Sequence, residues 1–109
     1  MTSQEVFDTV VKHLAAQGWE RSVNGGNCAY RAPDGKKCAI GALLLDDDVV
    51  EEGCSVWEMP PSFRKRLGND VGLMFLESLQ RAHDTGYAPW HMIENFRHIA
   101  RDRALTWPL

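Results

Sequence analysis

The feature that most constrains this fold is a glycine-rich break followed by two short apolar segments. Asn24-Gly25-Gly26-Asn27 favours positive φ and cannot continue a helix. Beyond it, residues 28–31 have the pattern of a strand, Pro33-Asp34-Gly35 that of a turn with glycine in the left-handed position, and residues 37–40 that of the return strand. The sequence therefore predicts one β-hairpin over residues 28–40.

A three-residue turn places Ala32 opposite Lys36, which fixes the register of this hairpin. Alternate residues then share a face, and the apolar set that turns inward comprises Cys28, Tyr30, Cys38 and Ile40. The set left to solvent comprises Ala29, Arg31, Lys37 and Ala39. Because the two cysteines are diagonal neighbours and not directly opposed, we expect free thiols in the core and no disulfide.

Helical signals occupy most of the remaining chain. Thr2-Ser3-Gln4-Glu5 is a capping-box pattern, and a second one begins at Ser55. Apolar residues recur at helical spacing in three places, the last of them opening with Pro89. The predicted helices span about residues 4–17, short pieces within 41–68, about 70–84 and about 89–104.

A chain of 109 residues holds one hydrophobic core, and 44% hydrophobic with 25% charged residues is an ordinary globular composition. We therefore expect a single α+β domain over residues 1–109, mostly helical, with one two-stranded antiparallel β-hairpin packed on the helices. No basic leader or long apolar run stands near the N-terminus, and three cysteines are an odd number for a disulfide framework. These features predict a cytoplasmic protein without a membrane span.

Cys38 is the first candidate for chemistry. It ends a predicted strand just before Gly41, where a helix N-terminus would lower the pKa of the thiol. A nucleophile also needs a base, and His83 with Asp84 is the available pair. A small cysteine-dependent enzyme is thus one alternative, although buried cysteine commonly acts as a small hydrophobe, which favours a protein that is not an enzyme.

A zinc site is a further alternative, but the spacing lacks the paired ligands of known zinc signatures. Its four ligands would come from Cys28, Cys38 and Cys54 with one of His13, His83, His91 or His98. The chain also lacks a phosphate-cradling glycine loop and a nucleophile elbow. We expect no bound cofactor or metal.

Charges of opposite sign are segregated along the chain, whose net charge is −3. The acidic stretch comprises Asp46, Asp47, Asp48, Glu51 and Glu52, and it is a candidate contact surface. The basic residues comprise Arg64-Lys65-Arg66 and, later, Arg97, Arg101 and Arg103. If the two basic segments adjoin, they form a patch for nucleic acid, a third alternative that the negative net charge disfavours.

The hairpin carries the run Asn27-Cys28-x-Tyr30-Arg31, then Gly35 and Cys38-Ala39-Ile40-Gly41-Ala42-Leu43, and Leu79-Gln80-x-x-His83-Asp84 lies downstream. Over most of the chain these residues resemble a family of small uncharacterised proteins encoded by phages and prophages. Those relatives tend to have a proline before the aspartate that follows the Gly-x-Leu segment, where this chain has Leu45 before Asp46. The resemblance implies a phage accessory protein in a bacterial host, acting by binding a host protein, including components of host defence. The acidic stretch would then serve as the contact or mimic the charge of nucleic acid.

Overall fold

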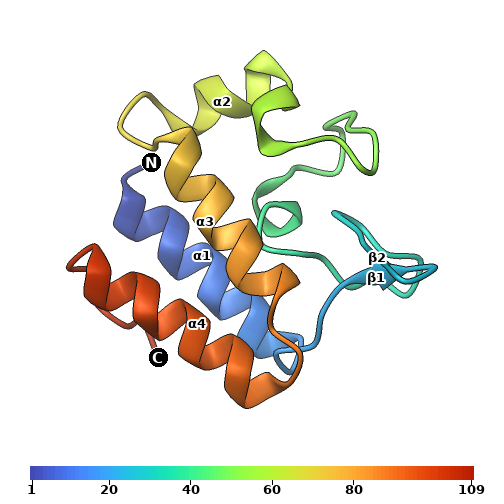
Figure 1. Ribbon diagram of the computed structural model, residues 1–109. Coiled ribbons are helices and arrows are strands. Elements are labelled where there is room, and N and C mark those ends of the chain that lie inside the picture. The colour runs from blue at the N-terminus through green and yellow to red at the C-terminus, as the bar shows by residue number, and fades with distance from the viewer.

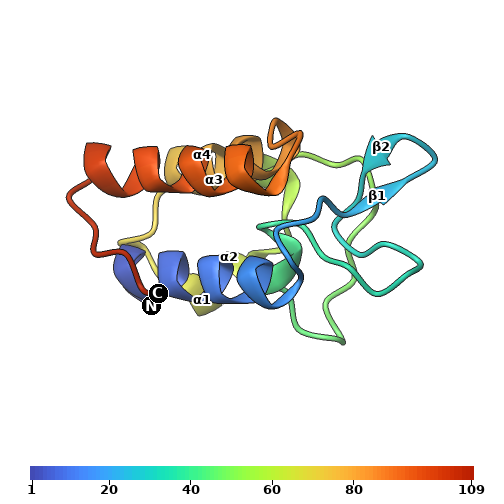
Figure 2. The same ribbon diagram turned by 90° about the horizontal axis from the view of Figure 1, so that it is seen from below.

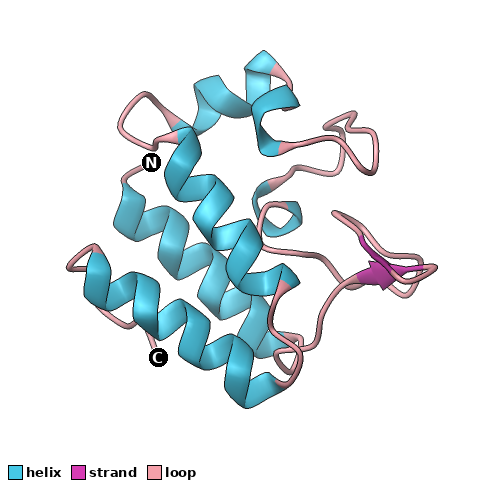
Figure 3. Ribbon diagram, viewed as in Figure 1, coloured by secondary structure: helices cyan, strands magenta, loops and turns pink.

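Helices dominate the computed structural model, which describes residues 1–109 (Figures 1 and 3). In chain order the elements are α1 (Ser3–Ala16), β1 (Val23–Asn24), β2 (Asn27–Cys28), η1 (Gly41–Leu43), η2 (Val56–Glu58), α2 (Pro61–Leu67), α3 (Leu73–Asp84) and α4 (Pro89–Asp102). The two strands form one antiparallel sheet. The α+β class with a two-stranded sheet is therefore confirmed.

The helices form two layers, with α3 and α4 side by side in one and α1 and α2 in the other (Figure 2). Both chain ends lie at one end of these layers, and the β1–β2 ribbon projects from the opposite end (Figures 1 and 2). The core fills the space between the layers, where the rings of Phe7 and Phe96 lie 6.4 Å apart. No helix of the protein combines the length and the apolar character that crossing a membrane takes.

Helix α1 begins where its capping box predicts. The Thr2 hydroxyl accepts the N–H of Glu5 at 3.1 Å, and the Glu5 carboxylate accepts the N–H of Thr2 at 2.9 Å. The buried face of α1 comprises Val6, Phe7, Val10, Val11 and Leu14. Burying each such side chain contributes about 1.5–3 kcal/mol, so this face anchors the helix to the core.

The predicted hairpin is wrong in its placement. Regular pairing joins Val23 to Cys28 and Asn24 to Asn27, one turn earlier than expected, because Gly25 and Gly26 adopt φ of 60° and 86°. Two consecutive positive φ angles make the two-residue turn that suits the twist of a hairpin. The glycine-rich break is therefore itself the hairpin turn.

Residues 28–40 keep the predicted register but not the predicted strands. The Ala32 N–H bonds to the Lys36 carbonyl at 2.9 Å, and one isolated bridge joins Arg31 to Lys37. Ala29 and Ala39 are buried, so the expected division into an inner and an outer face fails. The segment is an irregular loop.

Side chains from elsewhere replace the missing strand partners of this loop. The Gln17 amide bonds to both the N–H and the carbonyl of Lys37, each at 2.9 Å. The Glu52 carboxylate accepts the N–H groups of Tyr30 and Arg31 at 2.7 and 3.2 Å. These four bonds satisfy backbone groups that a ladder would otherwise use, and the chain can turn into η1 directly.

Gly41 allows two backbone segments to touch. A Cβ at this position would lie 1.9 Å from the Tyr30 carbonyl oxygen, a distance no side chain tolerates. The Gly41 N–H also bonds to the Cys38 sulfur at 3.4 Å. Residues 38–41 thus pack directly against the backbone of Tyr30, and glycine at position 41 makes this packing possible.

The later helices agree with the pattern of the sequence apart from their ends. Helix α3 begins at Leu73 and not near residue 70, because Gly68 with φ 90° starts a turn that the Val71 N–H closes. Helix α4 begins at Pro89 as predicted and ends at Asp102.

Candidate functional site

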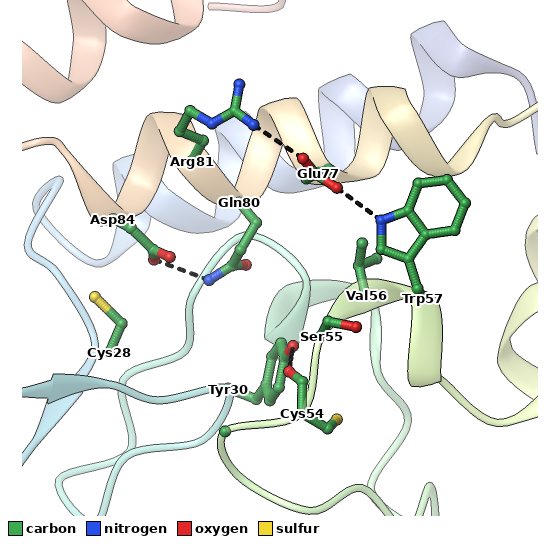
Figure 4. A pocket seen from close by; sticks show the side chains of 11 residues that line it. Cys28, Tyr30, Cys54, Ser55, Val56, Trp57, Glu77, Gln80, Arg81 and Asp84 are labelled. Carbon is green, nitrogen blue, oxygen red and sulfur yellow. Dashed lines mark hydrogen bonds and ion pairs between the residues drawn. The ribbon is translucent and has the colours of Figure 1, made fainter.

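A pocket of about 400 Å³ lies against one face of α3 (Figure 4). Glu77, Gln80, Arg81 and Asp84 line it from α3, where spacings of three and four residues bring them to a single face. Residues 53–57, together with Cys28 and Tyr30, close the other sides. We call this hollow the α3 pocket.

His83 lies behind the pocket, fully buried, with both ring nitrogens hydrogen-bonded. The N–H of Ser22 bonds to Nε2 at 3.0 Å, and Nδ1 lies 2.8 Å from the Asp84 carboxylate. Because an amide N–H only donates, Nε2 is the acceptor and Nδ1 carries the proton. His83 is therefore a neutral imidazole that links the end of α3 to the segment before β1.

This arrangement leaves His83 without a free lone pair. A general base and a metal ligand both need one. Coordination through Nδ1 would move the proton to Nε2, where it would face the N–H of Ser22. The predicted pair of His83 and Asp84 exists, but it supports the backbone.

The thiol beside this pair belongs to Cys28 and not to Cys38. One ligand atom each from Cys28, His83 and Asp84 lie within 4.8 Å of one another. Burial, and next the charge of Asp84, raise the pKa of the Cys28 thiol to about 11. This cysteine is protonated at neutral pH. Sequence analysis missed the contact because it depends on the two-residue turn before β2.

The remaining thiols are also held neutral. Burial raises the pKa of Cys38 to about 12 and outweighs the opposing effect of the Gly41 N–H. The lowered pKa predicted for Cys38 is therefore wrong. Burial likewise raises the pKa of Cys54. Since the thiolate is the nucleophile, these shifts argue against cysteine-dependent catalysis.

The four ligands proposed for zinc do not assemble. All three cysteines are free, and Cys38 is buried while Cys28 and Cys54 are half-buried. His13 bonds to Gln17, His98 pairs with Asp102, and His91 stacks on Tyr87. The only thiol cluster with a histidine is the one at His83, whose nitrogens are already occupied.

Trp57 is an exposed wall of the α3 pocket, with 52% of the residue accessible. Its indole N–H donates to the Glu77 carboxylate at 2.7 Å, and the other oxygen of Glu77 accepts from Arg81 at 2.9 Å (Figure 4). These bonds fix the ring beside a carboxylate. The sequence signal for this position was the second capping box, in which Glu58 bonds to the Ser55 N–H at 3.2 Å and so sets the turn that carries Trp57.

Trp57 also borders a second hollow of about 430 Å³ between α2 and α3. Apolar side chains supply most of its wall, among them Leu67, Val71, Leu73 and Met74. Arg64 is the one charged residue there. We call this hollow the Met74 groove.

The predicted acidic surface is divided between structural and exposed residues. Asp48 pairs with Arg66 at 2.7 Å, and Glu52 holds the loop at Tyr30. The exposed residues of the stretch are Asp46, Asp47, Glu51 and Glu52. Part of the acidic stretch is thus committed to the fold.

The two basic segments do not adjoin. Arg64-Lys65-Arg66 belongs to α2, which lies in the layer opposite α4 (Figures 1 and 2). Near the chain end, the Arg97 guanidinium lies 5.0 Å from the Trp107 ring, and that of Arg103 lies 4.9 Å from the Phe75 ring. The single patch that the nucleic-acid hypothesis requires is absent.

A separate group of exposed aromatic residues lies where α4 begins. Tyr87 and Trp90 are each more than two-thirds exposed and flank His91, and the Arg21 guanidinium lies 5.3 Å from the Tyr87 ring. We call this group the α4 corner.

No protein-family model matches this chain. No curated protein and no solved structure matches it either. The resemblance to phage and prophage proteins rests on the motif residues alone and stays a prediction.

Proposed function

We propose that this protein is a non-enzymatic protein-interaction module, a phage or prophage accessory protein that binds a host protein in the bacterial cytoplasm through the surface around Trp57. The observation that carries the proposal is the position of Trp57 itself. Its half-exposed ring is fixed by Glu77 and forms the wall shared by the α3 pocket and the Met74 groove.

Tryptophan is enriched among the residues that dominate binding energy at protein interfaces. A ring already held by a hydrogen bond loses little conformational entropy when a partner covers it. Two adjoining hollows beside such a ring offer places for side chains of the partner. These features together support a docking role for this face.

The chemistry of the interior supports the absence of catalysis. All three thiols have raised pKa values, and the one buried histidine has both nitrogens bonded within the chain. No side chain pair in the α3 pocket supplies an activated nucleophile with a free base. Binding is the function that remains for this surface.

The proposal is tested by capture from a bacterial lysate with the protein immobilised, comparing wild type with Trp57→Ala and Trp90→Ala. Trp90 is the matched control, because it is 72% exposed and lines neither the α3 pocket nor the Met74 groove. We expect a stoichiometric partner that Trp57→Ala loses and Trp90→Ala keeps. Recovery of no stoichiometric partner, or loss in Trp90→Ala alone, would overturn the proposal.

A further inference from the structure

We infer that the α3 pocket receives a basic side chain, arginine or lysine, from the partner protein, and that the Met74 groove receives an apolar side chain of the same segment. This inference rests on the proposed docking role of the Trp57 surface and names the chemistry of its occupant. Its basis is that carboxylates line the α3 pocket whereas apolar side chains line the Met74 groove, and the Trp57 ring borders both.

The α3 pocket presents carboxylates to its occupant. Glu77 stands beside the indole, and Asp84 stands two helical turns further along the same face of α3. Oδ1 of Asp84 accepts from Gln80 at 2.9 Å and lies 2.8 Å from Nδ1 of His83, and the Cys28 thiol also hydrogen-bonds to this carboxylate. All of these partners are neutral, so the charge of the Asp84 carboxylate can still attract a cationic donor.

One guanidinium of the chain, that of Arg81, already bonds to a carboxylate of the pocket lining. Arg81 bonds to Glu77 at 2.9 Å from the rim, with two-thirds of its side chain exposed. Arg81 is the one cation among the lining residues, against the carboxylates of Glu77 and Asp84, so the lining carries a net negative charge. An incoming cation would take the place of Arg81 on Glu77, and the charge of Asp84 in the same lining would add to the attraction.

The aromatic walls favour a cation over a neutral polar group. Trp57 donates its N–H to Glu77 from the edge of its ring, and the ring of Tyr30 also lines the pocket (Figure 4). The face of an aromatic ring is the negative part of its quadrupole and attracts ammonium and guanidinium groups. Charge and ring therefore select the same occupant.

The Met74 groove selects a different neighbour. Its wall is formed mainly by Leu67, Val71, Leu73 and Met74, with no carboxylate among its lining residues. Because Trp57 borders both hollows, a basic residue and an apolar residue close together in one segment can fill them at the same time. A segment of this composition is the occupant that the surface fits.

The test uses a minimal probe, N-acetyl-arginine N-methylamide, with the indole N–H resonance of Trp57 followed by NMR on the full chain. The uncharged control is N-acetyl-norleucine N-methylamide, and the anionic control is N-acetyl-glutamate N-methylamide. We expect saturable binding of the arginine probe only. Glu77→Gln should weaken it about tenfold, the scale of one charge-assisted bond, and Glu94→Gln on α4 should leave it unchanged.

A second variant should change the affinity for the arginine probe in the opposite direction. Arg81→Met keeps the aliphatic stem but frees Glu77, so it should tighten binding of the arginine probe several-fold. General damage to the fold cannot produce tighter binding, which makes this variant informative even if Glu77→Gln is unstable.

The inference fails if norleucine binds as well as arginine, if the glutamate probe binds better, if none of the three saturates, or if Arg81→Met weakens binding. These outcomes are distinct from failure of the docking role. Partner capture that still depends on Trp57 while the arginine probe does not bind removes only the inference drawn here. Capture that is independent of Trp57 removes the docking role whatever the probe does.

Discussion

Replacing His83 with alanine tests the structural role assigned to this residue. The change leaves the Ser22 N–H buried without an acceptor, and Ser22 is itself fully buried. An unsatisfied buried donor costs about 1–3 kcal/mol, and the cavity left by a fully buried side chain adds a similar amount. The bond to Asp84 adds little, because that carboxylate is 37% exposed and water can replace the imidazole. We expect a loss of about 3–5 kcal/mol.

Total stability for a domain of this kind is about 5–15 kcal/mol, so the variant should be measurably unstable without failing to fold. The assay is urea unfolding followed by far-ultraviolet circular dichroism. Because slopes for small proteins are about 1–3 kcal/mol/M, the midpoint should fall by about 1 M or more with the slope unchanged.

Two comparisons make the reasoning refutable. His83→Gln places an amide oxygen where Nε2 stands, so it should recover about half of the lost stability by accepting the Ser22 N–H. His98→Ala removes a histidine whose side chain is 67% exposed in an ion pair with Asp102, and should cost less than about 0.5 kcal/mol. A His83→Ala variant as stable as His98→Ala, or a glutamine variant no better than alanine, would show that the Ser22 bond does not support the fold.

Three further outcomes follow from the structure. Gly41→Ala should cost more than about 3 kcal/mol or abolish folding, because its Cβ would stand 1.9 Å from a carbonyl oxygen, whereas Gly72→Ala meets nothing within 4 Å and should fold normally on size-exclusion chromatography. The pKa of Asp48 is lowered, chiefly by the hydrogen bond from Arg66. The stabilisation of the fold by this ionised carboxylate is therefore complete above about pH 4 and is lost as the pH falls below that value. The urea midpoint of Asp48→Asn should therefore approach that of wild type as the pH falls below about 4, and an unchanged gap would contradict this. Because their pKa values are raised to about 11 and about 12, Cys28 and Cys38 stabilise the fold below about pH 9 and cease to do so as pH rises toward 12. Iodoacetamide near neutral pH should label Cys28 more slowly than a free thiol and Cys38 only on unfolding, and labelling of folded Cys38 at the rate of a free thiol would refute its burial.

Local signals in the sequence were sufficient for the helices. The capping box at Thr2 and Pro89 at a helix start act within one turn, so they could be recognised without tertiary information. The hairpin was displaced because two glycine turns compete within residues 24–35. The choice between them depends on Gln17 and Glu52, which bond to the loop from 20 or more residues away.

The site was predictable in its residues but not in their roles. The adjacency of His83 and Asp84 suggested a base, and only the fold shows that Nε2 meets a backbone donor 61 positions earlier. Trp57 carried no signal that distinguished an exposed ring from a core residue. Whether an aromatic side chain lies inside or outside depends on which neighbours cover it.

The contact between Gly41 and the Tyr30 carbonyl explains the motif Cys38-Ala39-Ile40-Gly41 by backbone packing, without reference to any activity. The contact is made by two backbones, so it restricts residue 41 to glycine while leaving the side chain at position 30 free to change. A sequence search with Cys-Ala-Ile-Gly would therefore find proteins in which two backbone segments pack together in this way, whatever those proteins bind. Functional divergence among such proteins should be sought at positions such as Trp57 and Arg81, which face outward and lie outside the motif.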